Sequence, residues 1–322
     1  MRKAVPAPLP ERSAAGGKDT ASTSASSASA SDIDSAAGVI ASAPAVQPKG
    51  SAAPLTTESA AGDAPLAESA AADDIAVSQR VPITTTYPMN IVGKLFAYDA
   101  EGNEELKCSA SVIVSDTAST IWTAAHCVHR GDGSGSAGFY EQLMFIPAYK
   151  DGESPWGLWA ATTKYAPTAY TEDTDNLESD FAAVELAPDP TYGKIQDAMG
   201  AFGYSFGSGS DYSDVTTAGY PGEGYNRTDL DGEYMMYCYG NAEDYANLNP
   251  LDDRIKMDCD MGKGASGGPM VIASDESGLQ IIGANSHYIG DASTGERAND
   301  DLLSSEHGVR AANVIAAVND SA

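Results

Sequence analysis

The sequence has few basic side chains and no long apolar run. It contains 18 Lys and Arg residues against 46 Asp and Glu residues, which gives a formal net charge of -28 at pH 7. A surface of that sign repels nucleic acid and anionic lipid, so neither is an expected partner. Because no stretch of about 18 apolar residues occurs, no segment is expected to span a membrane as a helix.

Aromatic residues are missing from the N-terminal part of the chain, where Ala and Ser dominate and Tyr87 is the first aromatic residue. Such a composition buries too little apolar surface to offset chain entropy, so residues 1–80 are expected to be a disordered pro-segment or linker. A signal peptide is not evident either, because "MRK" is followed by "AVPAPLPERSAAGG", which has no apolar core. The 4 cysteines nevertheless favour an exported protein, since none has the Cys-x-x-Cys spacing of a metal or redox site.

From Tyr87 onward, short apolar runs alternate with turn residues. Runs such as "CSASVIVSD", "STIWTAAHCV" and "LQIIGANSHY" are rich in β-branched or aromatic residues and are separated by Gly, Asp, Asn or Pro. This pattern is typical of an all-β sandwich or barrel. Only "GVRAANVIAAVN", residues 308–319, has the apolar spacing of a helix.

The stretch "MGKGASGGP", Met261 to Pro269, surrounds one serine with four glycines. It lacks the Gly-x-x-x-x-Gly-Lys-Ser/Thr order of a phosphate-binding loop. Two interpretations stay open for the stretch on its own: a flexible turn, or a loop that presents Ser266 as a nucleophile.

Two further runs contain a histidine and an acid. His126 lies in "TIWTAAHCV" and Asp180 in "ESDFAAVEL". Taken singly, the first is more often a core residue and the second a strand-start residue. A serine nucleophile, however, needs a base, an acid that orients the base, and backbone N–H donors for the oxyanion. The three runs together contain all of these groups.

The motifs "TAAHC", "SDFAAV" and "GASGGP", in the order His, Asp, Ser, resemble the chymotrypsin-like serine peptidases. With "VGKLF" and "FIPAYKDG", the chain is most similar to the secreted trypsin-like and V8-like peptidases of actinobacteria, over roughly residues 85–290. The resemblance implies an all-β fold of two six-stranded antiparallel β-barrels. The first barrel would occupy residues 81–190, and the second residues 191–322 with a short C-terminal helix.

The resemblance also implies roles for individual residues. His126 would be the general base, Asp180 its orienting acid and Ser266 the nucleophile, with the backbone N–H groups of Gly264 and Ser266 forming the oxyanion hole. The implied activity is hydrolysis of protein or peptide substrates through an acyl-enzyme, by a secreted monomer without cofactor or metal. The implied disulfides are Cys108–Cys127 and Cys238–Cys259.

The chain departs from the family at the residue before the nucleophile. Ala265 stands where many animal members have an Asp that pairs with the freshly cut N-terminus. We therefore expect any latency to come from the N-terminal segment, through occlusion of the site or delayed folding.

Substrate preference has more than one interpretation. Asp260 has the spacing of the acid at the bottom of the trypsin pocket and would favour Lys or Arg, although the adjacent Cys259 could turn it to solvent. His287 could instead bind an acidic side chain, and Ser286 fits the position of the substrate-binding strand.

Other functions are also compatible with parts of the sequence. A catalytically inactive double-barrel binding protein is the main alternative, although inactive relatives usually lose one of the three residues. An esterase of the α/β-hydrolase type would need a Gly-x-Ser-x-Gly motif, which is absent. The acidic run "DTDNLESD", residues 173–180, has the carboxylate density of a calcium loop but lacks the spacing of an EF-hand, so a solvated loop is favoured.

Overall fold

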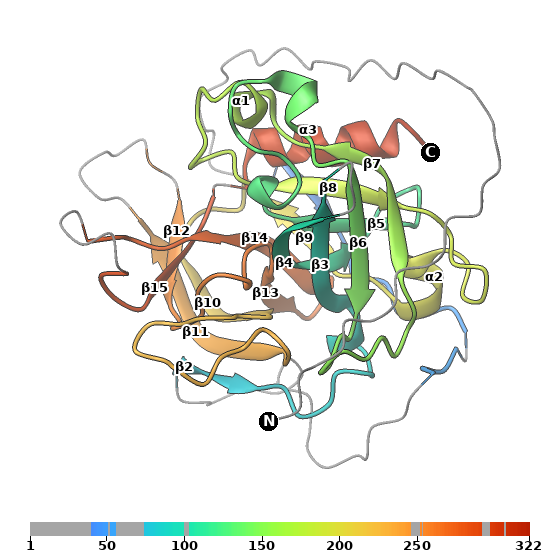
Figure 1. The fold of residues 1–322 in the computed structure, drawn as a ribbon, viewed down its shortest axis with the longest axis horizontal. Coiled ribbons are helices and arrows are strands. Elements are labelled where there is room, and N and C mark those ends of the chain that lie inside the picture. Colours follow the sequence, from blue (N-terminus) through green and yellow to red (C-terminus); the bar gives the residue numbers. More distant parts are fainter. Residues whose placement is uncertain are drawn as a thin grey trace.

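The computed structural model describes residues 40–50, 52–55, 74–99, 103–245, 252, 254–291, 297–305 and 307–322. These residues form two β-barrels that lie side by side, with a helix across the first barrel (Figure 1). The predicted all-β class with two six-stranded antiparallel barrels is confirmed.

The first barrel is a closed ring in the order β3-β4-β5-β8-β7-β6. Large apolar side chains fill it because alternate strand residues point inward, and Leu95, Phe145 and Trp159 are all at most 1% exposed. Its strands are β3 Val92–Tyr98, β4 Glu104–Ile113, β5 Thr120–Thr123, β6 Gln142–Pro147, β7 Trp159–Tyr165 and β8 Ala182–Leu186.

The second barrel has the order β14-β13-β10-β11-β12-β15 and is closed by pairing of β15 with β14. A further strand, β9 Gly203–Phe206, adds to β14 in parallel on the outside of this ring. The strands of the ring are β10 Tyr212–Gly219, β11 Met236–Asp244, β12 Ile255–Asp258, β13 Pro269–Ser274, β14 Gly278–His287 and β15 Asp301–Ser304.

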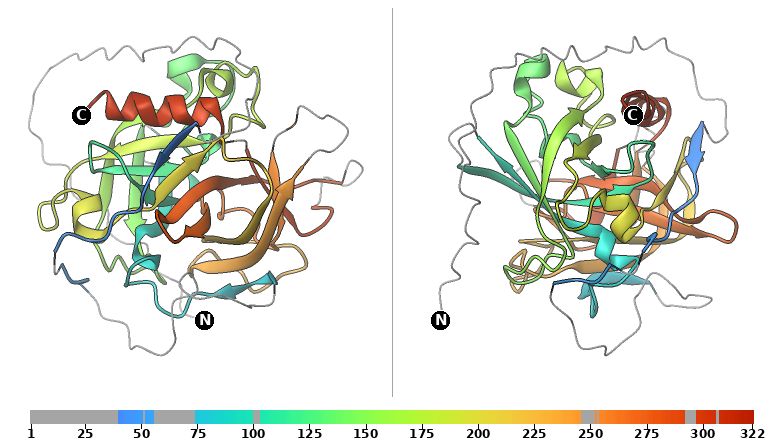
Figure 2. Two further views of the ribbon diagram at one scale, coloured as in Figure 1. Left: turned by 180° about the vertical axis from the view of Figure 1, so that it is seen from behind. Right: turned by 90° about the vertical axis from the view of Figure 1, so that its right-hand side faces the viewer.

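Part of the N-terminal segment is folded, which corrects the expectation that residues 1–80 lack structure. β1 Ala41–Ala43 pairs with β9, and β2 Ile75–Arg80 pairs with β11 (Figure 2). The small side chains of β1 fit against β9, and Gly203 makes room, since a Cβ there would lie 2.2 Å from the Ala43 carbonyl oxygen. Composition alone missed these strands because a barrel built elsewhere in the chain supplies their partners. The other residues of this segment lie largely outside the described part.

Helices are few and short. α3 Val309–Asn319 confirms the predicted C-terminal helix, and it follows the second barrel but packs on β7 and β8 of the first. None of the helices in the described ranges is long and apolar enough to cross a membrane. The remaining helical turns are α1 Thr168–Thr171, α2 Ile195–Met199, η1 Met89–Ile91, η2 Ala125–Cys127 and η3 Gly135–Gly138.

Candidate active site

His126 lies on the 3₁₀ turn η2, directly after β5, and is held by both its backbone and its ring. Its backbone N–H donates to Asp180 Oδ1 at 2.8 Å, and its Nδ1 lies 2.7 Å from Asp180 Oδ2. The neighbouring Cys127 is bonded to Cys108 on β4 with a Cα–Cα distance of 6.1 Å. The ring is therefore fixed with Nδ1 toward the carboxylate, which leaves Nε2 as the nitrogen that can take up a proton.

Asp180 precedes β8 and is buried, with only 5% of its surface exposed. Ser286 Oγ donates to its Oδ2 at 2.6 Å, and its backbone N–H donates to Ser305 Oγ at 3.0 Å. Burial alone would raise the pKa of Asp180, but the charge of His126 and the hydrogen bonds from His126 and Ser286 lower it. Burial would likewise lower the pKa of His126, and Asp180 raises it instead. The pair thus stabilises a carboxylate beside an imidazole that readily accepts a proton.

Ser266 lies in a tight loop between β12 and β13. Gly267 in this loop has φ +81, and a Cβ there would lie 2.0 Å from Thr123 Oγ1 and 2.3 Å from the Ser109 carbonyl oxygen. Ser109 on β4 holds the loop from the first barrel: its N–H donates to Ser266 O at 2.7 Å and its Oγ to Gly264 O at 2.8 Å. No sequence motif pointed to Ser109, although Ser109 directly follows Cys108, which the resemblance placed in a disulfide.

The backbone of the same loop presents N–H donors. Ala265 N–H donates to Gly262 O at 3.0 Å and Gly267 N–H to Asn285 O at 2.6 Å. In contrast, across the described residues the N–H groups of Gly264 and Ser266 donate to no protein acceptor. Two free donors on either side of Ala265, in the loop that carries the serine hydroxyl, form a site that can bind an oxyanion.

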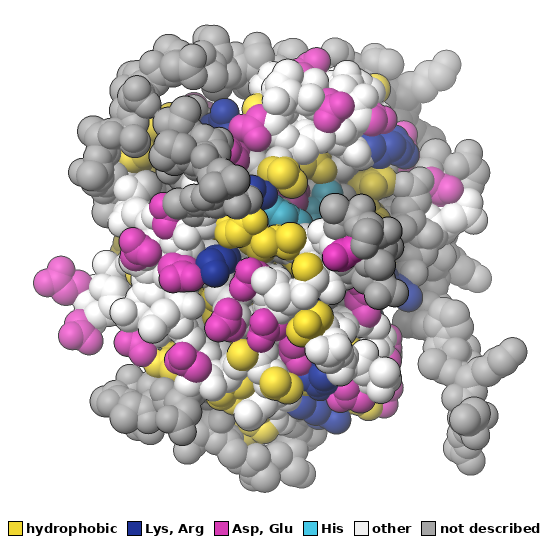
Figure 3. Space-filling view, turned by 90° about the vertical axis from the view of Figure 1, so that its left-hand side faces the viewer, with side chains coloured by type: hydrophobic (Ala, Val, Ile, Leu, Met, Phe, Trp, Pro, Cys, Tyr) yellow, Lys and Arg dark blue, Asp and Glu magenta, His cyan; other side chains and the backbone are white. Residues whose placement is uncertain are grey.

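A pocket brings these groups together. Ser286 and His287, both on β14, line it. Figure 3 shows histidine side chains in the middle of one face of the molecule, with hydrophobic side chains next to them and acidic ones around. The residues that line the pocket are His126, Gly262, Lys263, Ser266, Asn285, Ser286, His287, Tyr288 and Leu302.

Asp260 does not line this pocket, which contradicts the expectation of a trypsin-like acid at its base. Its carboxylate pairs with Arg227 Nη1 at 2.6 Å and accepts the Ser78 N–H at 2.9 Å. Asp260 is only 3% exposed, so it does not face solvent either. Its neighbour Cys259 is bonded to Cys238, so both disulfides of the structure join the cysteines that the resemblance implied.

His287 uses both ring nitrogens within the protein. Nδ1 lies 2.7 Å from Ser286 Oγ, and Nε2 lies 2.7 Å from Arg254 Nη1, whose guanidinium also pairs with Asp252. Burial and the Arg254 charge lower the pKa of His287 to about 4. A neutral ring with no spare N–H cannot bind an acidic substrate side chain, so that expectation is not supported. Arg254 had no signal in the sequence.

The candidate metal ligands do not form an ion site. Both groups of close ligand atoms in the described part of the chain contain disulfide-bonded cysteines, whose sulfurs are not thiolates. In the acidic run, Asp175 pairs with Arg310 at 2.5 Å and Asp173 accepts a hydrogen bond from Asn176 at 2.6 Å. These carboxylates are engaged by protein groups, as in a solvated loop.

Comparison with known proteins places this fold. No family model matches the chain, and no curated protein matches it in sequence. Among solved structures, the protease Anisep from Arthrobacter nicotinovorans is 26% identical, with 71% of this chain and 95% of that chain covered and a TM-score of 0.60. A thermostable serine protease, AL20, from an extremophilic microorganism is 24% identical, with 72% and 96% covered and a TM-score of 0.57. A Glu endopeptidase in complex with MPD is 17% identical, with 77% and 97% covered and a TM-score of 0.54.

These structural neighbours are chymotrypsin-like serine proteases, and the chain has their double six-stranded barrel. The resemblance stated from the sequence motifs is thereby confirmed. The likeness supports a peptidase in general terms.

Proposed function

We propose that the protein is a secreted serine endopeptidase that cleaves peptide bonds in protein substrates through an acyl-enzyme. The observation that carries this proposal is the shared pocket. Ser266 and His126 both line it, the buried Asp180 carboxylate fixes Nδ1 of His126, and the loop of Ser266 carries the free N–H groups of Gly264 and Ser266. The two disulfides support an extracellular location, since such bonds persist in oxidising surroundings.

In the proposed mechanism, Ser266 Oγ attacks the substrate carbonyl carbon while His126 Nε2 takes its proton. Asp180 stays ionised and stabilises the imidazolium that forms. The negative charge on the substrate oxygen is bound by the N–H groups of Gly264 and Ser266. His126 then protonates the leaving amine, and a water molecule activated by the same histidine releases the acid product.

A fluorophosphonate probe tests this proposal, because it reacts only with an activated serine. We expect the wild-type chain to be labelled and Ser266→Ala to stay unlabelled. Cleavage of a mixed peptide library should fall about 10⁴-fold or more in Ser266→Ala and His126→Ala. Circular dichroism serves as the control for folding of each variant.

The opposite result identifies the main alternative. If the folded wild-type chain is no more reactive than Ser266→Ala and cleaves no peptide in the library, the peptidase proposal is wrong. The protein would then be a double-barrel binding protein.

A further inference from the structure

The segment that leads into the Ser266 loop is braced by the N-terminal strand β2. Asp260 N–H donates to Ala76 O at 2.9 Å, and Ser78 N–H donates to Asp260 Oδ1 at 2.9 Å. Arg227 Nη1 binds Asp260 Oδ2 at 2.6 Å and reaches Ser78 O at 3.2 Å. One buried carboxylate therefore joins three chain segments that are far apart in sequence.

Asp260 is also the first residue of a short ladder of backbone hydrogen bonds that supports the pocket wall. Residues 222–225 run alongside residues 260–263: Tyr225 N–H donates to Asp260 O at 2.8 Å, Gly262 N–H to Glu223 O at 2.9 Å and Gly222 N–H to Lys263 O at 2.8 Å. Gly262 and Lys263 line the pocket, and Gly264 follows with its free N–H. A shift of this ladder would move the oxyanion donors directly.

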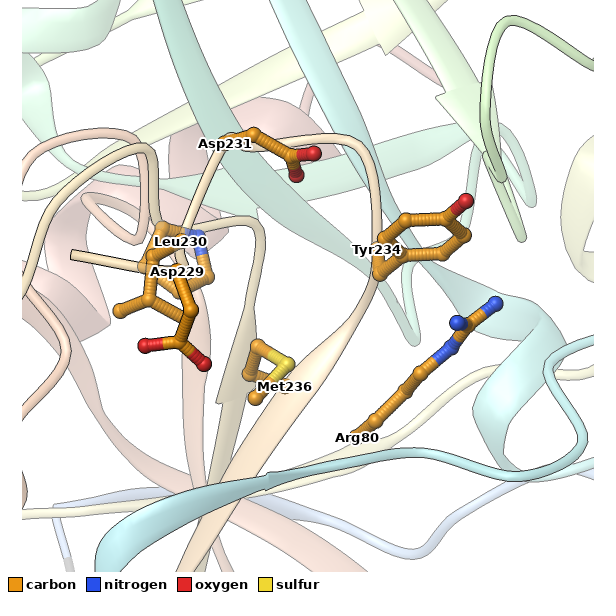
Figure 4. Close-up of a pocket in the computed structure, with 7 residues that line it drawn as sticks. Arg80, Asp229, Leu230, Asp231, Tyr234 and Met236 are labelled. Carbon is orange, nitrogen blue, oxygen red and sulfur yellow. The ribbon is translucent and has the colours of Figure 1, made fainter. Parts of the chain in front are cut away.

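Beyond Ser78, the end of β2 is separated from the loop of residues 222–232. Figure 4 shows a cavity between Arg80 at the end of β2 and the loop residues Asp229 and Leu230. On the far side of the cavity, the Arg80 guanidinium stacks over the Tyr234 ring at 3.5 Å. Since residues 229–231 and the end of β2 are separated here, the side-chain contacts between β2 and this loop gather around the Asp260 carboxylate.

We propose that Asp260 is a positioning residue that fastens β2 to the loop of Ser266, so that catalysis requires β2 to be docked. This inference rests on the proposed peptidase function. The same contact explains why position 265 needs no acid. Residues 260–264, which precede Ala265, are ordered by the internal strand β2 and not by a free N-terminus. Any processing that yields an active enzyme must then leave residues 75–80 in place.

The test compares Asp260→Asn with Asp229→Asn in the full chain. Asp229 binds the same Arg227 at 2.7 Å but is 66% exposed at its side chain, so it is a matched control. The two oxygens of Asp260 accept from Ser78 N–H and from Arg227, whereas an asparagine amide has one oxygen and one N–H₂ group. In Asp260→Asn the N–H₂ group must therefore face either the guanidinium or the Ser78 N–H, which places two donors together. We expect kcat to fall about tenfold or more with KM within about threefold, and Asp229→Asn to resemble wild type.

Hydrogen–deuterium exchange provides a readout that does not need activity. Asp260→Asn should lose amide protection in residues 75–80 and 222–226, while β3 in the first barrel keeps its protection. Unchanged kcat and unchanged protection would overturn the proposal, and so would equal loss of protection in β3. If the wild type fails to react with the fluorophosphonate probe, the peptidase proposal is wrong. Hydrogen–deuterium exchange still tests, independently of activity, whether Asp260 holds β2 to the loop.

A second pair of variants covers the case in which Asp260→Asn does not fold. Arg227→Gln keeps the Ser78 N–H hydrogen bond to Asp260 and removes the cation together with its contacts to Asp260, Ser78 and Asp229, so it should lower kcat by a smaller factor. Arg227→Lys restores the charge and should recover part of that loss. If both variants have the wild-type kcat and exchange pattern, Asp260 does not act through this contact and the proposal is wrong.

Discussion

Arg254 fixes the protonation of His287. The guanidinium can only donate, so the Nε2 of His287, 2.7 Å from Nη1, must be the unprotonated acceptor. The ring proton is then on Nδ1 and points to Ser286 Oγ, which in turn donates to Asp180. A chain of hydrogen bonds thus runs from a buried arginine to the carboxylate that orients His126.

Replacing this arginine should change the titration of His287. Burial and the Arg254 charge both lower the pKa of His287 to about 4. In Arg254→Met the lowering by the Arg254 charge is lost, while burial and His126 still lower the pKa of His287, and Asp180 and Asp252 raise it, so the pKa should rise from about 4 toward its ordinary value of 6.5. Histidine NMR titration measures this shift. Lys256→Met, two residues further along the chain on β12 and paired with Glu243, should leave it unchanged.

Loss of the Ser286 hydroxyl should affect turnover more than substrate binding. Ser286→Ala removes a donor from the buried Asp180 carboxylate, and this hydrogen bond lowers the pKa of Asp180. A hydrogen bond to a charged group contributes roughly 1.5–3 kcal/mol, so we expect kcat to fall about tenfold in steady-state assays. Ser274→Ala, on β13 and outside the pocket, is the control. Equal kcat in the two variants would show that Ser286 does not orient Asp180.

Gly267→Ala should disrupt the Ser266 loop. Gly267 and Gly152 share φ +81, but a Cβ at Gly267 meets Thr123 and Ser109, whereas a Cβ at Gly152 meets nothing within 4 Å. Both substitutions introduce left-handed strain of about 1 kcal/mol. Only Gly267→Ala adds the steric clash, for a total of at least about 3 kcal/mol. Urea unfolding measures both losses, and similar losses would contradict this account of the loop.

His307 should make the protein less stable in acid. It is buried, accepts a hydrogen bond from Trp122 Nε1 at 2.8 Å, and has its pKa lowered by burial to about 4. Between pH 6.5 and 4 the unfolded chain binds a proton that the folded chain does not. The free energy of unfolding should therefore fall by roughly 3 kcal/mol as the pH drops through this window, and be fully restored above it.

His307→Gln isolates this effect, because a glutamine oxygen can still accept from Trp122 but does not titrate. Urea unfolding at pH 7 and pH 4.5 should show a smaller acid loss in this variant than in wild type. His129→Gln replaces another buried histidine, bound to Gly135 O at 2.6 Å, as a comparison. An acid loss that is the same in His307→Gln and in wild type would disprove the assignment.

The short apolar runs predicted an all-β sandwich or barrel, and the resemblance of three local motifs implied the two barrels and the roles of His126, Asp180 and Ser266. The packing partners of these residues carry no such pattern. Asp260 illustrates the difference: its spacing to Ser266 favoured a substrate-binding acid, yet Arg227, 33 residues away, and Ser78, 182 residues away, occupy its carboxylate. Contacts over such separations follow from the closed barrel and not from neighbouring residues.

The N-terminal strands were missed for a related reason. A three-residue strand such as β1 has no periodicity of its own, and its stability comes from the sheet that it joins. The glycine at 203 that receives it lies about 160 residues later in the chain. The protonation of His287 likewise depends on Arg254, which precedes β12. Arg254 reaches His287 on β14 because β12 pairs with β15 and β15 pairs with β14.

The pairing of β1 and β2 with the second barrel bears on how the protein behaves after it is cut. β1 lies on β9 and is anchored further by Lys49, whose Nζ is 2.7 Å from Asp197, while β2 lies on β11. A single cut between residues 55 and 74 would leave one strand on each side of the break, both still paired with the sheet. Such a protein would behave as one particle in solution and separate into two chains only on a denaturing gel, so removal of the leading piece and cleavage of the chain are distinct events.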